Sequence, residues 1–124
     1  MTDQILLYVA AALTAIWGVA HLFPTSSVVR GFGDLGQDNR LIITMEWIIE
    51  GVALIFIGAL VATVTFIDPS GAVSRAVYGL AAAVLLALAL VSLFTGFRIK
   101  FLPFRLCPVI FSTAAVLILA GGLM

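Results

Sequence analysis

Apolar residues occupy most of the chain, in four long runs separated by short polar segments. The runs cover residues 5–23, 41–67, 73–97 and 106–124. Each run is close to or above the roughly 20 residues that an α-helix needs to cross about 30 Å of hydrocarbon. The pattern therefore predicts an all-α protein, an integral membrane four-helix bundle, which forms a single transmembrane domain over residues 1–124.

Residues that end or begin helices separate the runs. Pro24 ends the first run, because proline has no N–H and restricts the residue before it. Residues 68–71 have the composition of a tight turn, and residues 98–105 form a short basic connection. Pro108 is expected in the first turn of the last helix, where a missing N–H costs little.

Residues 24–40 form the longest predicted loop, and we expect it to be cytoplasmic for the reason given below. Gly31, Gly33 and Gly36 are turn residues, and apolar side chains between them make part of the loop amphipathic. We expect that part to lie against the membrane surface. The glycines follow no strand and lack the Gly-Lys-Ser/Thr ending of a phosphate loop, so they predict flexibility rather than nucleotide binding.

Composition supports the membrane assignment. The chain is 64% hydrophobic and 10% charged, with a mean hydropathy of +1.29. A soluble domain carries about 25% charged residues, because its surface faces water. The formal net charge is zero, so nothing predicts a nucleic-acid partner, and the first expected partner is the lipid bilayer.

Lysine and arginine predict the orientation. The loop and the basic connection would lie on one side of the membrane and together carry Arg30, Arg40, Arg98, Lys100 and Arg105. The opposite side carries Arg75 alone. Cytoplasmic segments collect positive charge, so we expect a multi-pass protein of the cell (inner) membrane with both termini non-cytoplasmic. Only Asp3 is charged before the first run, which favours a retained helix over a signal peptide.

Small residues recur on two of the expected helices. In the third run they repeat every four residues, at Gly79, Ala83 and Ala87. In the first run they form a narrow stripe, made of Ala10, Ala11, Thr14 and Gly18. Membrane helices associate through close packing, which small residues permit. We expect each stripe to face a neighbouring helix, in the same chain or in another.

Three ionisable side chains lie within or near the apolar runs. Glu46 and Glu50 are four residues apart and share a helix face, and His21 shares a face with Trp17 and Gly18. An ionised carboxylate that faces lipid is costly. We therefore expect all three ionisable groups to point into the bundle, with Glu50 near His21.

The pattern leaves three interpretations of this site open. In a structural interpretation, the two glutamates only pair with neighbouring groups such as Arg40 or His21. In a second, the three groups line a polar pocket for a small molecule or a quinone-like head group, with Trp17 and Trp47 as walls. In a third, they bind a metal or transfer protons, because one histidine and two carboxylates suit a transition metal.

Part of this pattern resembles a known family. Gly18-x-x-His21, followed by a loop and by Met45-Glu46-Trp47-x-x-Glu50-Gly51, is similar to small bacterial four-helix membrane proteins of the DoxX-like kind. The layout covers the whole chain, and the motif covers its first half. Better-known members are associated with quinone-linked or thiol-linked redox complexes, which implies the pocket interpretation. Cys107 is the only cysteine, so this chain alone has no cysteine pair for thiol–disulfide chemistry.

We therefore expect a cytoplasm-facing polar intramembrane site in a small-molecule-binding or quinone-binding subunit of a membrane assembly. The alternatives are a small proton-coupled transporter that works as an oligomer, and a purely structural membrane subunit. Expected partners are a quinone or lipid ligand, further copies of the chain, or a larger membrane complex. The sequence names no catalytic residue, cofactor or metal. The candidates for ligand binding or proton relay are His21, Glu46, Glu50, Trp17, Trp47 and Arg40.

Overall fold

The computed structural model describes residues 1–124 and consists of helices without strands. In chain order the helices are α1 (Thr2–Leu22), α2 (Thr25–Gly31), α3 (Gln37–Ile67), α4 (Ala72–Phe94), the 3₁₀ helix η1 (Gly96–Arg98) and α5 (Leu102–Gly122). By length and composition, α1, α3, α4 and α5 are long and apolar enough to cross a membrane. The chain is thus an all-α four-helix bundle, as its hydrophobic pattern predicts, with four candidate spans of a multi-pass membrane protein.

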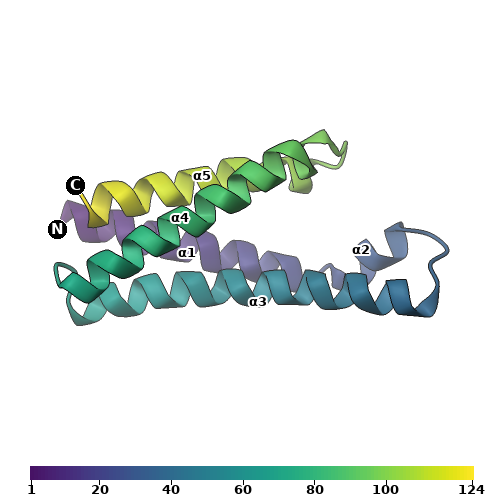
Figure 1. Ribbon diagram of the computed structural model, residues 1–124, viewed down its shortest axis with the longest axis horizontal. Coiled ribbons are helices and arrows are strands. Elements are labelled where there is room, and N and C mark those ends of the chain that lie inside the picture. Colours follow the sequence, from purple (N-terminus) through teal and green to yellow (C-terminus); the bar gives the residue numbers. More distant parts are fainter.

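The four long helices are arranged as two packed pairs. α1 lies along α3, α4 lies along α5, and α5 also packs against α1 (Figure 1). Both termini and the α3–α4 turn meet at one end of the molecule, on the left of Figure 1. Toward the other end, α4 and α5 diverge from α3 (Figure 1). That wider end carries α2 and the α4–α5 connection.

Glycines allow the backbones of α1 and α3 to touch. A Cβ atom at Gly18 would lie 2.6 Å from the carbonyl oxygen of Gly51, and one at Gly58 would lie 2.5 Å from that of Ala11. No larger residue fits at such distances, so these glycines set the close approach of the two helices. The predicted packing stripe of α1 is buried against α3, and its members are Ala10, Ala11, Thr14 and Gly18.

The small-residue stripe of α4 lies on the outside of the bundle. Ala83 and Ala87 are exposed, and a Cβ atom at Gly79 would have no neighbour within 4 Å. The buried face of α4 instead includes Tyr78, whose hydroxyl group is hydrogen-bonded to Thr65 of α3 at 2.9 Å. With Tyr78 on the buried face of α4, the small residues lie on the opposite, outer face. The stripe therefore does not pack against another helix of this chain, and its packing against a helix of another chain stays a prediction.

The segment predicted as a loop, residues 24–40, contains α2 and the first turn of α3. α2 packs against α3 and buries Val29. α3 has 31 residues and α1 has 21. Because the end of α1 lies level with Trp47, as the contacts of Gly18 indicate, residues 37–46 of α3 extend beyond α1 and are accompanied by α2.

The last helix begins earlier than predicted. α5 starts at Leu102, so Pro103 occupies its first turn and Pro108 lies inside the helix. Pro103 takes the position at which a missing N–H is tolerated. Pro108 cannot donate a hydrogen bond to the carbonyl group of Phe104, four residues earlier. The longer helix brings residues 102–107 alongside α1.

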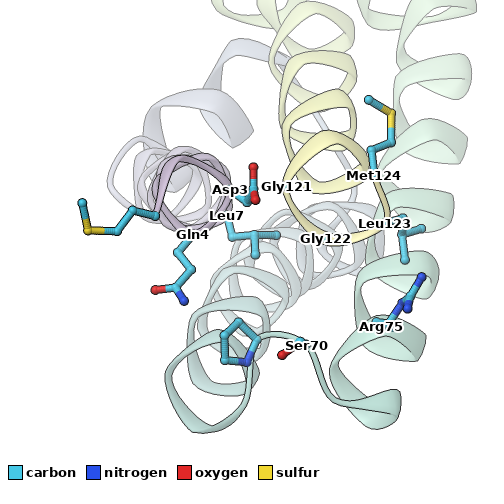
Figure 2. Close-up of a pocket in the computed structure, with 11 residues that line it drawn as sticks. Asp3, Gln4, Leu7, Ser70, Arg75, Gly121, Gly122, Leu123 and Met124 are labelled. Atoms are coloured by element: carbon cyan, nitrogen blue, oxygen red, sulfur yellow. The ribbon is translucent and has the colours of Figure 1, made fainter.

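A polar cavity of about 300 Å³ lies at the end of the bundle where the two termini meet (Figure 2). Asp3, beside Gly121, and Arg75, beyond Leu123, lie on different sides of it (Figure 2). No ion pair joins Asp3 to Arg75. This cavity is at the opposite end of the molecule from His21.

Candidate functional site

His21 lies in the last turn of α1 and is 5% exposed. Its Nδ1 atom is 2.9 Å from the carbonyl oxygen of Trp17. A carbonyl oxygen can only accept a hydrogen bond, so Nδ1 carries the proton of this contact. The other ring nitrogen, Nε2, is therefore the one that is free to gain or lose a proton.

The Nε2 atom of His21 faces the Oε1 atom of Glu50 at 3.4 Å, in the only ion pair of the chain. Two lone pairs would repel at this contact, so it is stable when one proton lies on either the imidazole or the carboxyl group. The side chain of His21 is 6% exposed and that of Glu50 is 40% exposed. Glu50 is therefore the more accessible member of the pair. The predicted proximity of Glu50 to His21 is confirmed.

Glu46 does not join this pair. It is exposed, although it lines the same groove between α3 and α4 as Glu50. The expectation that all three ionisable groups point into the bundle is wrong for Glu46, because α1 ends level with Trp47 and leaves this turn of α3 uncovered. No three His, Cys, Asp or Glu side chains lie close enough together to hold a metal ion.

Arg40 also lies apart from His21 and Glu50. It is exposed and lines a different cavity, between α2 and α3. No ion pair links Arg40 to Glu46. The structure therefore brings together His21, Glu50 and the two tryptophans, and it separates Glu46 and Arg40 from the imidazole.

A cavity of about 310 Å³ lies beside His21, between α1, α2, α3 and the start of α5. Its walls include four aromatic side chains and the imidazole of His21, and we call it the aromatic cavity. The centres of the His21 and Trp47 rings are 4.8 Å apart, those of Trp17 and His21 are 5.8 Å apart, and those of Trp47 and Phe104 are 5.5 Å apart. Its volume is at the lower end of the range of small-molecule sites, which are mostly apolar with a few polar groups.

The two indole N–H groups of this cavity differ. Nε1 of Trp47 donates a hydrogen bond to the carbonyl oxygen of His21, which fixes the ring. Nε1 of Trp17 is buried and has no acceptor, and it is the only buried side-chain polar atom of the chain without a partner. An unsatisfied buried donor costs about 1–3 kcal/mol. The indole of Trp17 thus lines the cavity and has an N–H without an acceptor within the protein.

The pair of His21 and Glu50 lies between two cavities. His21 lines the aromatic cavity. Glu50 lines the groove between α3 and α4, which has a volume of about 380 Å³ and also contacts Leu88 of α4. Trp47 lines both spaces. A proton that moves between His21 and Glu50 would pass from one space to the other.

Sequence reasoning missed the contribution of α5. Phe101, Phe104 and Cys107 all line the aromatic cavity. The sequence pattern places Phe101 and Phe104 in the basic connection of residues 98–105. It gives Cys107 no role in the candidate site. Their three-residue spacing, which places side chains on one helix face, was the available signal.

The arrangement can bind a flat ring between aromatic side chains, with the imidazole of His21 beside it. These properties come from Trp17, Trp47, Phe104 and His21. No protein-family model, no curated protein and no solved structure matches this chain.

Proposed function

We propose that this chain is a small-molecule-binding subunit of a membrane assembly, and that its ligand is a flat ring with carbonyl groups, such as a quinone head group. The ligand binds in the aromatic cavity beside His21. The observation that carries the proposal is the set of aromatic side chains that line this cavity beside the imidazole of His21, among them Trp17, whose buried N–H has no acceptor within the protein. A ring carbonyl would supply the acceptor that this donor lacks.

The position of the cavity along the helices supports an amphiphilic ligand. The cavity lies at the end of α1 and the start of α5, close to one limit of these two candidate spans. A head group at this level would keep an apolar tail within the hydrocarbon. The similarity of the His21 and Glu50 segments to the DoxX-like kind supports the same class of ligand.

The proton on the His21–Glu50 pair gives the site a second means of recognition. His21 lines the cavity, so an imidazolium or a shared proton can stabilise negative charge on a carbonyl oxygen. The proposal concerns binding. Electrons for any redox step would come from another component of the assembly.

Intrinsic fluorescence tests the proposal directly. Trp17 and Trp47 are the only tryptophans of the chain, and both line the cavity. Titration of the purified protein in detergent with a short-tailed quinone should give saturable quenching. Trp17→Phe keeps an aromatic ring and removes the donor, so we expect affinity to fall about 2- to 10-fold, as for one net hydrogen bond.

A filled cavity provides the control. Cys107→Phe adds a ring to the cavity wall, and Val116→Phe adds the same ring to an exposed position of the same helix. Saturable quenching should be lost in the first variant and retained in the second. Non-saturable quenching of equal size in both variants would contradict the proposal.

A proton-coupled transporter that works as an oligomer is the second candidate. The position of the His21–Glu50 pair between two cavities favours it. In vesicles with an internal pH-sensitive dye and an imposed potential, such a protein should carry protons, and Glu50→Gln should stop the flux. Flux no greater than in protein-free vesicles would exclude this candidate, and failure of the quinone titration as well would favour a purely structural subunit.

We also propose that the wide end of the bundle faces the cytoplasm and that the protein lies in the cell (inner) membrane. Five of the six basic residues belong to α2, the start of α3, the α4–α5 connection and the first turn of α5, and Arg75 alone lies at the other end. Both termini would then be non-cytoplasmic.

A further inference from the structure

A separate cavity of about 430 Å³ lies between α2 and α3, and two arginines line it. Arg30 comes from the end of α2 and Arg40 from the first turns of α3. The packing of α2 on α3 brings the two residues to one cavity, although nine residues lie between them. The cavity shares no lining residue with the aromatic cavity beside His21.

The positive charge of this cavity is not compensated by a carboxylate. The only ion pair of the chain joins His21 to Glu50, and no acidic residue lines the cavity. Arginine does not lose its proton in proteins, so both charges are permanent. Both arginines are exposed at one cavity, so a single anion can approach both charges.

Three hydroxyl groups lie on the wall of this cavity, and two of them already donate hydrogen bonds within the helices. Thr25 donates a hydrogen bond to the carbonyl oxygen of Leu22 at 2.8 Å, and Thr44 donates to that of Arg40 at 2.7 Å. These two protons are therefore used within the helices. Ser26, also on the cavity wall, has no such bond. The donors that remain for a ligand are the two guanidinium groups and the Ser26 hydroxyl.

The depth of the cavity matches the head-group layer of a bilayer. The end of α1 lies level with Trp47, and Arg40 is seven residues further along α3, or about 10 Å at 1.5 Å per residue. The polar layer of a bilayer extends roughly 5–7 Å beyond the hydrocarbon on each side. With α3 along the bilayer normal, Arg40 lies just beyond this layer, and its long side chain can reach back to the phosphate level. Phe23, which is 87% exposed, lies on the cavity wall and suits the adjoining acyl chains.

We propose that Arg30, Arg40 and Ser26 form a binding site for a phosphate group. The planar guanidinium group binds phosphate oxygens in a bidentate manner, and basic pockets between membrane helices bind phosphate-bearing head groups. The phosphate can belong to an anionic lipid or be free in solution, and the two sources are distinguished below. This site is independent of the proposed quinone cavity.

The experiment measures thermal unfolding of the full chain in neutral detergent. Phosphatidylglycerol, phosphatidylcholine with the same acyl chains, and inorganic phosphate are added separately. A ligand that binds the folded state raises the midpoint, and we expect phosphatidylglycerol to raise it by at least about 3 °C, with no rise for phosphatidylcholine. A rise with inorganic phosphate alone would assign the site to soluble phosphate, and a rise with the anionic lipid alone would assign it to the head group.

The double variant Arg30→Gln/Arg40→Gln should lose this rise. The matched control is Arg98→Gln/Lys100→Gln, which removes two exposed positive charges from the same end of the bundle but leaves the cavity intact. We expect the control to keep the full rise. Equal loss in both double variants would show unspecific attraction and overturn the proposal, as would no rise with any phosphate in the unmodified protein.

A second measurement tests the proposal if the double variant Arg30→Gln/Arg40→Gln does not fold. Arg30→Lys/Arg40→Lys keeps both charges and lacks the planar fork, so it should bind phosphate more weakly while folding normally. Native mass spectrometry of this variant, with phosphatidylglycerol at a fixed excess, should detect fewer protein–lipid complexes than for the unmodified chain. An unchanged number of complexes would overturn the assignment to the two guanidinium groups.

Discussion

The indole N–H of Trp47 in α3 donates a hydrogen bond to the carbonyl oxygen of His21 in α1. This carbonyl belongs to the last turn of α1, where no further residue of the helix can donate to it. Thr25 also approaches it, at 3.3 Å. Trp47 thus satisfies the end of one helix from its neighbour, and it does so beside the imidazole of the candidate site.

Removal of the Trp47 donor should lower stability. In Trp47→Phe the ring remains and the bond to His21 is lost, so we expect a loss of about 0.5–1.5 kcal/mol in the free energy of unfolding. Trp17→Phe is the matched control, because its N–H has no acceptor. That variant should be as stable as the unmodified protein or more stable. Thermal unfolding in detergent compares the two, and equal destabilisation would contradict the assigned roles.

Substitution of glycine should distinguish the inner and outer faces of the bundle. A Cβ atom at Gly18 would lie 2.6 Å from the backbone of α3, so Gly18→Ala should cost about 1–3 kcal/mol by overpacking. At Gly79 a Cβ atom has no neighbour within 4 Å. Gly79→Ala should therefore gain up to about 1 kcal/mol from helix propensity. A larger loss at Gly79 than at Gly18 would show that the outer stripe is packed against another chain.

The pair of His21 and Glu50 should respond to the loss of its proton. Above the pH at which this proton is removed, the Glu50 carboxylate faces an unprotonated Nε2 at 3.4 Å, and stability should fall. In Glu50→Gln an amide N–H can be directed at Nε2 without any titrating proton, so the fall should be absent.

Glu46→Gln is the control for this variant, because Glu46 is exposed and does not contact His21. Its pH profile of thermal unfolding should match that of the unmodified protein. If Glu46→Gln removed the pH dependence of thermal unfolding and Glu50→Gln kept it, the dependence would arise from Glu46, which would contradict its assignment to the His21–Glu50 pair.

Cysteine labelling tests the proposed orientation. Ser26, at the wide end, and Ser70, in the α3–α4 turn, are both exposed. An impermeant thiol reagent should label Ser70→Cys in intact cells and should label Ser26→Cys only after the membrane is opened. Cys107 is buried, so it gives a low background. Labelling of Ser26→Cys in intact cells would reverse the orientation.

Much of the fold could be predicted because hydrocarbon thickness requires long apolar runs. The contact of His21 with Glu50 could also be anticipated, since each residue shares a helix face with small residues. The outward direction of Ala83 could not. α4 carries two adjacent stripes, and only the contact of Tyr78 with Thr65 in the folded chain selects the buried one.

The candidate site was predicted less completely, because its cavity depends on the relative lengths of helices. α1 is shorter than α3, which leaves Glu46 uncovered, and the early start of α5 brings Phe104 to the cavity. The apolar runs already indicate that α3 is the longer helix, but they show neither how far it extends beyond α1 nor that α5 begins at Leu102. The sequence suggests Arg40 as a partner of Glu46. In the structure α2 packs against α3 and brings Arg30 to the same cavity as Arg40, and this packing has no strong signal in the sequence.

The divergence of α4 and α5 from α3 gives the molecule the shape of a wedge (Figure 1). Its cross-section is small where the termini meet and larger where α2 and the α4–α5 connection lie. In a bilayer, the two leaflets would therefore surround perimeters of different size. A wedge of this kind would displace more lipid from one leaflet than from the other.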